Sequence, residues 1–299
     1  MKLRDVSQPR WFIVSLILVF ICLATASLSA QSSDSEYKGF TAYEQARAST
    51  SDTGQFVVLD TNIGYDFNRH VGMDIGIPVF FIRPTITGLP QQWTNELGDP
   101  YWDLRLTADN PVLNYATAIT VAVPVHKAGT ALSTGRVGVD WFNHFDRPIY
   151  RLTPFVNAGL ANGIINTRLL SQPFRLNRLF QSLGFIADLE GGMDFRLARF
   201  LKVGGSYYAL EPSGNQKIYG PSSVGNVNSA SQLNSPFVPN ATLITHDRGY
   251  SAWIRLTPSR FFFIEPGYSH SIKLDQDAAT ITVGLDFSSI FRRPSARRH

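Results

Sequence analysis

The feature that most constrains this chain is an alternation of large apolar residues with small, polar or acidic ones, which repeats from about residue 40 onward. In 55–67 and 71–79 the odd positions are mostly large and apolar, whereas the even positions include Asp60, Asp66 and Asp74. Alternate residues of a β-strand point to opposite faces, so this period predicts strands with one apolar and one polar face. A buried carboxylate without a partner is costly, so these acids must be either paired or in contact with water.

The same period predicts twelve strands and no helix in the mature chain. The expected strands are 40–50, 55–67, 71–83, 100–109, 115–125, 135–145, 149–161, 180–195, 199–211, 247–257, 260–272 and 277–288. Short connections at 68–70, 110–114, 146–148, 197–199 and 257–259 alternate with a mostly long set at 84–99, 126–134, 162–179 and 212–246, whose short members lie near 51–54 and 273–276. This arrangement is typical of an all-β, transmembrane antiparallel up-and-down β-barrel, in which the short turns face the periplasm.

The competing architecture is a soluble β-sandwich or lipocalin-like barrel, whose apolar face would point inward. A small soluble barrel fills its interior with large side chains, whereas the polar face here is rich in Gly, Ser, Thr and Asp and suits a wet interior. Aromatic residues also gather at the expected periplasmic strand ends, as in an interfacial girdle; they are Tyr65, Phe67, Phe145, Tyr150, Phe195, Phe200, Phe261 and Phe287. The transmembrane barrel is therefore the preferred architecture.

Residues 1–30 have the order of a secretory signal peptide: basic residues, then an apolar stretch at 11–24, then small residues. Cleavage is expected after Ala26 or Ala30, and an uncleaved anchor is the alternative. The single cysteine, Cys22, lies in this segment, so the mature chain is expected to have neither a disulfide framework nor thiol chemistry. The predicted organisation is a signal peptide at 1–30, an outer-membrane β-barrel at 31–291 and a basic periplasmic tail at 292–299.

Charge and motifs narrow the function classes. Lys and Arg number 27 against 23 Asp and Glu, and this mild, scattered bias does not indicate nucleic-acid binding. The sequence contains no phosphate-binding glycine motif, Cys-x-x-Cys motif or metal-ligand histidine spacing, so we expect no cofactor and no metal. Ser and His are neighbours in YSHS (268–271), but strand neighbours point to opposite faces, so a lipid-acting outer-membrane hydrolase is the least favoured function.

A set of ionisable residues on the polar face forms the candidate lumen lining, and acids outnumber bases in it. The candidates are Asp60, Asp74, Asp103, Arg105, Asp140, Asp188, Glu190, Arg255 and Glu265, and Asp66, Arg151 and Lys202 are expected on the same face. Cross-strand pairing would make a charged plug that rigidifies the barrel. An open lumen would instead carry a negative field that favours cations and polar neutral solutes over anions. The residues leave both interpretations open.

A family resemblance rests on ELGDPYWDLRLTA (96–108) and AITVAVPVHKAGTALSTGRVGVDWF (118–142). These segments resemble the outer-membrane barrel family of meta-pathway phenol-degradation or transporter-like proteins. The matching turn and loop-edge residues are Gly98, Asp99, Pro124, Gly129, Leu132, Ser133, Thr134 and Gly135. VPVHKAG departs from the tighter Pro-Thr-Gly step of that family. The resemblance implies residence in the outer membrane and passage of small, often hydrophobic or aromatic compounds, and it carries over no catalytic residues.

The sequence thus predicts an outer-membrane channel or transporter for small molecules in a double-membrane (Gram-negative) bacterium, and not an enzyme. The alternative is a structural or adhesion barrel that uses its long loops at 162–179 and 212–246. The expected partners are membrane lipid, small-molecule solutes and the barrel-assembly machinery, without nucleic acid.

Overall fold

The computed structural model describes residues 38–52, 54–85, 92–108, 112–125, 133, 135–163, 181–219 and 246–288. The strands in this part of the chain are β1 (Gly39–Ser51), β2 (Gly54–Asp66), β3 (Val71–Pro84), β4 (Thr94–Leu97), β5 (Tyr101–Ala108), β6 (Asn114–Ala122), β7 (Gly138–Asp146), β8 (Leu152–Ala161), β9 (Gln181–Ala198), β10 (Leu201–Tyr219), β11 (Asp247–Ser259), β12 (Phe262–Ser271) and β13 (Gln276–Asp286). Within the described residues, no helix is both long and apolar enough to cross a bilayer. The predicted signal peptide (1–30) and basic tail (292–299) lie outside these residues.

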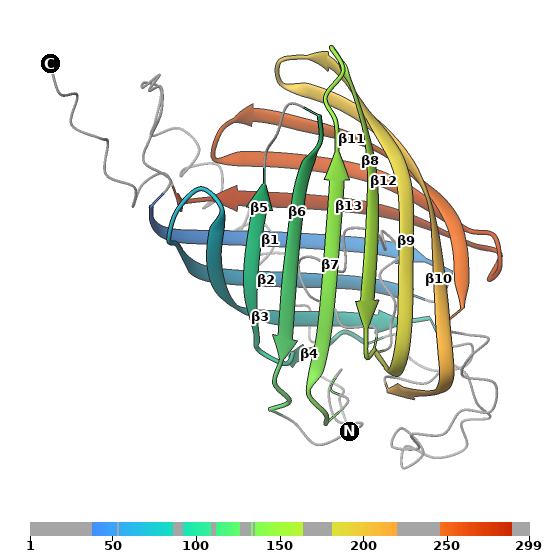
Figure 1. Ribbon diagram of the computed structural model, residues 1–299. Coiled ribbons are helices and arrows are strands. Elements are labelled where there is room, and N and C mark those ends of the chain that lie inside the picture. The colour runs from blue at the N-terminus through green and yellow to red at the C-terminus, as the bar shows by residue number, and fades with distance from the viewer. Residues whose placement is uncertain are drawn as a thin grey trace, which may run out of the picture. The chain divides into compact units, whose positions relative to one another are not determined.

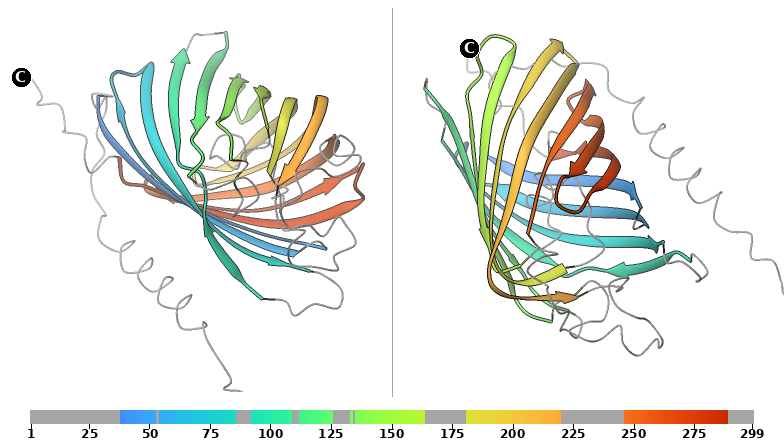
Figure 2. Two further views of the ribbon diagram at one scale, coloured as in Figure 1. Left: turned by 90° about the horizontal axis from the view of Figure 1, so that it is seen from below. Right: turned by 90° about the vertical axis from the view of Figure 1, so that its right-hand side faces the viewer.

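The strands form one closed antiparallel sheet (Figures 1 and 2). Chain neighbours pair around the barrel, and β1 closes it by pairing with β13. β3 pairs with β5 through Val71–Gly76 and with β4 through Val79–Ile82, so β4 and β5 together occupy one position in a twelve-stranded wall. Closure joins the first and last strands of the sheet, which is how a sheet avoids open edges in a membrane.

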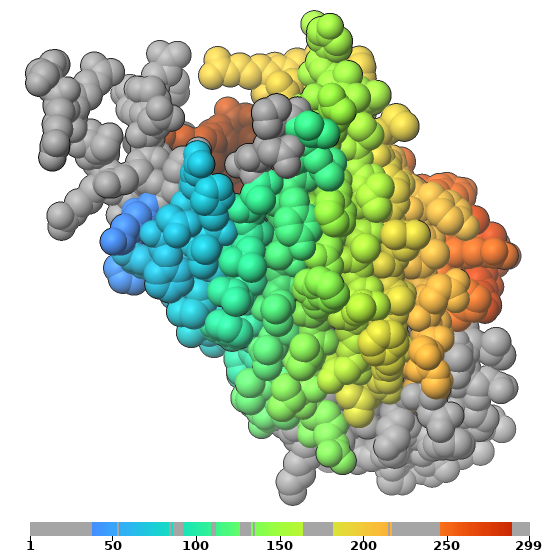
Figure 3. All heavy atoms as spheres, viewed as in Figure 1, coloured from blue at the N-terminus to red at the C-terminus, as the bar shows by residue number. Residues whose placement is uncertain are grey.

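Burial alternates along each strand with the period seen in the sequence. On β2, Asp60 is 4% exposed, whereas Ile63 is 61% exposed. Because no second layer packs against the sheet in the described residues, the buried side chains point into the barrel and the exposed ones point outward. The outward set is largely apolar and includes Ile75, Leu189, Ile254 and Ile281, and the space-filling view shows the continuous outer surface of the wall (Figure 3). This apolar exterior is what lipid requires, so the prediction of a transmembrane barrel rather than a soluble sandwich is confirmed.

Short turns gather at one end of the barrel, which by the convention of such barrels is the periplasmic end. Expected girdle residues Phe67, Phe195 and Phe200 are exposed near these turns. Aromatic rings also meet across strands there: the centroids of Phe40 and Tyr65 are 5.2 Å apart. Exposed aromatics at strand ends match the interfacial position expected from the sequence.

Two predicted loops contain strand. The expected loop 84–99 includes β4, because Thr94–Leu97 pairs with the end of β3. β10 runs to Tyr219 rather than to residue 211, because it continues to pair with β9 beyond an irregularity between Ser213 and Lys217. The expected loop at 212–246 therefore begins later, and its residues 220–245 lie outside the described part, as do 164–180.

The start of β8 and the position of Arg151 were also predicted incorrectly. Ile149 and Leu152 exchange backbone hydrogen bonds of 2.7 and 2.9 Å, which close a two-residue turn around Tyr150 and Arg151. Tyr150 adopts a positive φ of 56° and is fully exposed. Arg151 is exposed in this turn instead of lying on the inner wall, because the alternation of β8 begins only at Leu152.

Replacing Ile281 with Arg should lower the free energy of unfolding by about 2–4 kcal/mol, because Ile281 faces outward near the middle of β13 and the charge would enter lipid. Ile272→Arg is the matched control, since Ile272 is similarly exposed but lies in a turn after β12, and it should cost less than about 1 kcal/mol. Equilibrium urea unfolding in phospholipid vesicles measures both. Equal losses would contradict the assignment of the outer face to lipid.

Candidate lumen site

The structure brings the candidate residues together on the inner face of the wall. The seven carboxylates among them are each at most 6% exposed; they are Asp60, Asp74, Asp103, Asp140, Asp188, Glu190 and Glu265. Arg105 and Arg255 are partly buried and contact carboxylates of neighbouring strands. The inner wall is therefore acidic and closely packed at these positions.

Part of this wall is a line of side chains set by the strand register. Asp74 on β3 lies opposite Asp103 on β5, Asp103 lies opposite Thr120 on β6, and Thr120 lies opposite Asp140 on β7. The Thr120 hydroxyl donates to Asp103. On β9, Asp188 and Glu190 lie opposite Gly159 and Asn157 of β8 and extend the acidic surface beyond β7. We call Asp74, Asp103, Asp140, Asp188 and Glu190 the carboxylate ribbon.

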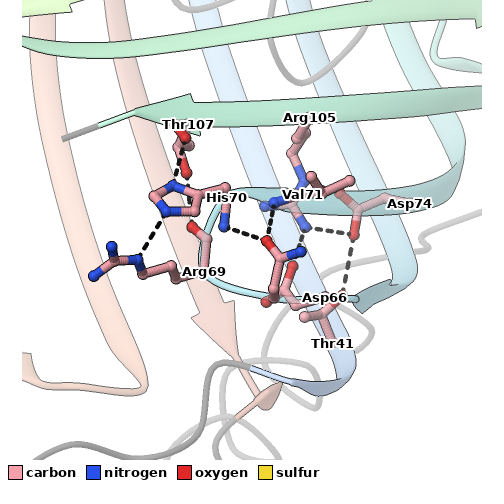
Figure 4. Close-up of polar contacts among 9 residues, drawn as sticks. Thr41, Asp66, Arg69, His70, Val71, Asp74, Arg105 and Thr107 are labelled. Carbon is pink, nitrogen blue, oxygen red and sulfur yellow. Dashed lines mark hydrogen bonds and ion pairs between the residues drawn. The ribbon is translucent and has the colours of Figure 1, made fainter.

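The first carboxylate of the ribbon is neutralised by Arg105 (Figure 4). Arg105 Nη2 donates to Asp66 Oδ1 at 3.0 Å and to Asp74 Oδ1 at 3.2 Å, and Arg105 Nε also contacts Asp74. Thr41 Oγ1 donates to the same Asp74 oxygen at 3.0 Å. This cluster joins β1, β2, β3 and β5 at the periplasmic end of the lumen and acts as a structural ion pair.

The turn between β2 and β3 is fixed beside this cluster (Figure 4). Asn68 Oδ1 accepts hydrogen bonds from the backbone N–H of His70 at 2.7 Å and of Val71 at 3.0 Å. The Nδ1 atom of His70 lies 2.9 Å from the carbonyl oxygen of Thr107 on β5. The side chain of Asn68 therefore shapes a turn whose next residues are tied to the neighbouring strand.

The carboxylate of Asp60 on β2 is hydrogen-bonded to Tyr101 of β5. Tyr101 Oη donates to Asp60 Oδ2 at 2.7 Å and accepts from Asn62 Nδ2 at 3.2 Å. The tyrosine ring lies against Gly76, where an added Cβ would collide with the ring. A glycine is needed on β3 at this point so that the large side chain can lie along the wall.

The carboxylates of Glu190 and Asp247 also accept hydrogen bonds from side chains of neighbouring strands. Glu190 accepts from Asn157 Nδ2 at 2.6 Å and from Ser206 Oγ at 2.5 Å. Asp247, at the start of β11, accepts from Ser271 Oγ at 2.5 Å and from Tyr208 Oη at 3.1 Å. Asp247 was not among the predicted inner-wall acids, although it shares one face of its strand with the small residues Gly249 and Ser251.

Asp140 differs from these residues in its hydrogen bonding. It has no exposed surface, and neither of its carboxylate oxygens has a hydrogen-bond donor within the described part of the chain. Asp188 Oδ2 also lacks a donor there. Asp188 and Asp103 both lie close enough to Asp140 to repel its charge. The ribbon thus contains one carboxylate that the described structure leaves uncompensated.

Basic side chains of the inner wall concentrate on other strands. Lys202 on β10 lies opposite Arg196 of β9 and Arg255 of β11, so three cations stand side by side near the periplasmic end. Arg255 Nε donates to Glu265 Oε2 at 2.5 Å. Arg47, a buried residue of β1, is a further inner-wall cation that the sequence analysis did not single out.

The Ser-His neighbours of YSHS do not converge. Ser269 Oγ lies 2.9 Å from Ser251 Oγ inside the barrel, whereas His270 Nδ1 lies 2.8 Å from the exposed carboxylate of Asp277. The two side chains point to opposite faces of β12, so they form no nucleophile–base pair. In the part of the chain that the structure describes, no group of three His, Cys, Asp or Glu side chains is placed to hold a metal ion.

The two segments that carry the family resemblance meet at the extracellular end of the wall. Asp99 Oδ1 accepts from the backbone N–H of Val125 at 3.2 Å, and Asp99 Oδ2 accepts from Ser133 Oγ at 2.9 Å. Ser133 Oγ in turn accepts from the N–H of Gly135 at 3.2 Å. These residues therefore join two loop edges, a structural role consistent with turn chemistry.

Comparisons with known proteins support the fold. No protein-family model and no curated protein matches the chain. Among solved structures, an outer membrane channel from Pseudomonas putida F1 has a TM-score of 0.55 at 8% identity, covering 87% of this chain and 100% of that one. The chain is an outer-membrane β-barrel. The structure supports this through its closed sheet and apolar exterior, and the likeness supports the same fold.

Other similar structures include the NanC porin, with a TM-score of 0.47, 6% identity, and coverage of 81% of this chain and 98% of that one. The KdgM porin in complex with disordered oligogalacturonate has a TM-score of 0.44, 9% identity, and coverage of 82% and 99%. None of these likenesses confirms the phenol-degradation or transporter-like family, so that finer assignment stays a prediction.

Replacing Arg105 with Met should lower the free energy of unfolding of this outer-membrane barrel by about 3–5 kcal/mol, because it removes the guanidinium that both Asp66 and Asp74 contact. Adding Asp74→Asn to that variant should restore part of the loss. Arg147→Met, at an exposed turn position, should change stability by no more than about 0.5 kcal/mol. Urea unfolding in vesicles measures all three, and a loss at Arg105 no larger than at Arg147 would rule out a structural ion pair.

Proposed function

We propose that this outer-membrane barrel is a channel for small solutes. The observation that carries the proposal is the acidic inner wall, above all the uncompensated carboxylate of Asp140. A barrel that served only as a rigid scaffold would be at least as stable with apolar side chains filling its interior. Ionisable groups on the inner wall are instead expected where water and polar solutes pass.

The charge of the wall favours one class of solute. Five carboxylates line the inner face from β3 to β9 in the carboxylate ribbon, where Asp74 is paired with Arg105 and Asp140 has no donor within the described residues. This concentration of acids would give the β3–β9 side of the lumen a negative potential, which favours cations and polar neutral molecules over anions. Asp60, Asp103, Asp140, Asp188, Glu190 and the Arg255–Glu265 pair are accordingly proposed to line the path.

The apolar part of the inner wall supports a further solute class. Phe56, Val58, Phe80 and Ile82 form a buried cluster on β2 and β3, and the two rings lie 5.6 Å apart. Small hydrophobic or aromatic compounds, which the family resemblance implies, would find apolar contacts there. The proposed solutes are therefore small molecules that combine an apolar part with a neutral or positive polar group.

A structural barrel is the second candidate, and specific contacts favour it. The ion pairs of Arg105 and Arg255 join neighbouring strands, and the ribbon carboxylates have almost no accessible surface in this structure. A conducting state must therefore expose them, whereas a purely structural barrel would keep them covered. The accessibility of Asp140 in the membrane separates the two functions.

Asp140→Cys should react with a charged, membrane-impermeant methanethiosulfonate in vesicles, and the reaction should reduce single-channel conductance in planar bilayers. No other cysteine of the mature chain should react, because Cys22, in the predicted signal peptide, is the only native cysteine. Trp141→Cys is the matched control, since Trp141 is the next residue of β7 and faces outward into lipid, where the reagent cannot reach it. Failure of the reagent to modify the Asp140→Cys variant, together with absent conductance, would favour the structural barrel.

A further inference from the structure

We propose that Asp140, flanked by Asp103 and Asp188, binds the ammonium group of a permeating solute. This inference rests on the proposed channel function and names the chemical group that the inner wall selects. The three carboxylates are on β5, β7 and β9, so one strand separates Asp140 from each of the other two. Adjacent strands are about 4.8 Å apart, so successive carboxylates start from backbone positions roughly 10 Å apart.

Asp140 is the centre of the site because it lacks partners that its neighbours have. Asp103 accepts a hydrogen bond from Thr120, whereas both oxygens of Asp140 and one oxygen of Asp188 have no donor in the described residues. Asp140 is fully buried on the inner wall and is repelled by Asp188 and Asp103. Burial and like-charge neighbours disfavour an uncompensated charge at Asp140, and a bound cation that donates hydrogen bonds would relieve both effects.

Small residues lie beside these carboxylates on the two strands that separate them. β8 separates Asp140 from Asp188 and contributes Gly159 and Ala161 to the inner wall. A Cβ added to Gly159 would collide with Asp188 Oδ1, so the carboxyl of Asp188 lies directly over this glycine. On the other side, β6 contributes Ala118 and Ala122. Small side chains therefore border these carboxylates on β6 and β8, whereas the large side chain of Leu210 on β10 lies opposite Asp188 and Phe142 is the next inward residue of β7.

The geometry favours an ammonium group over a metal ion. Metal ions such as Ca²⁺ need several oxygens at about 2.3–2.6 Å around one point, and the described carboxylates are not grouped in that way. An ammonium group carries its own N–H donors and needs no ring of oxygens at one fixed distance. The missing element at Asp140 is a donor, and a primary ammonium supplies both the donor and the opposite charge.

Ammonium and potassium ions test this inference because they are similar in size and charge but only ammonium donates hydrogen bonds. In planar bilayers with NH₄Cl on one side and KCl on the other, the reversal potential should show that NH₄⁺ is preferred over K⁺. Asp140→Asn, which keeps the shape but removes the charge, should reduce that preference by roughly fivefold, which corresponds to about 1 kcal/mol. Asp277→Asn removes one carboxylate from the exposed outer face and should leave the preference unchanged.

A binding measurement separates failure of the site from failure of the channel. Calorimetric titration of the detergent-solubilised full chain with methylammonium chloride should show binding that Asp140→Asn weakens by roughly tenfold, about 1.4 kcal/mol. Conductance with an NH₄⁺ preference that Asp140→Asn does not change would overturn the ammonium site and leave the channel standing. Methylammonium binding that depends on Asp140 without any conductance would support the site and overturn the channel. Equal binding of potassium and methylammonium would overturn the donor argument.

Discussion

The structure depends on the requirement that every backbone hydrogen-bonding group be paired within the membrane. An antiparallel sheet meets that requirement only when its first and last strands join, as β1 and β13 do here over nine residue pairs. Closure divides each strand into a side in lipid and a side in the lumen. The apolar residues of this chain can then be exposed and its acids buried without contradiction, which no single-sheet soluble fold would allow.

Within the closed wall, the lateral pairing of strands decides how each inner side chain is compensated. Arg105 reaches Asp74 and Asp66 on strands far away in the sequence, and Tyr101 reaches Asp60 in the same way. These side chains lie along the wall where the adjoining strand carries a small residue, as Tyr101 does over Gly76 and Asp188 over Gly159. The glycines on the polar face therefore determine the space that the charged groups occupy.

Much of the fold could be predicted from the sequence because the two-residue period is a local property that closure does not alter. Strand existence, the inner position of Asp60 and the outer position of Ile63 all follow from it. The short β4 was missed because it pairs over only four residues and has no extended alternation. Arg151 was misplaced because the turn around Tyr150 breaks the period locally.

The partners of the candidate residues could not be predicted because they depend on the register between strands. Nothing in the sequence near Asp140 distinguishes it from Asp74, yet one has no donor in the described residues and the other contacts both Arg105 and Thr41. The register also separates the charges of the inner wall, with the carboxylate ribbon on β3 to β9 and the adjoining Arg196, Lys202 and Arg255 on β9 to β11. The cations lie near the periplasmic end, whereas Asp140 lies near the other end of β7, so in the proposed channel a positively charged solute would be repelled at the periplasmic mouth and attracted farther along the wall. The two clusters are therefore parts of one electrostatic profile along the barrel.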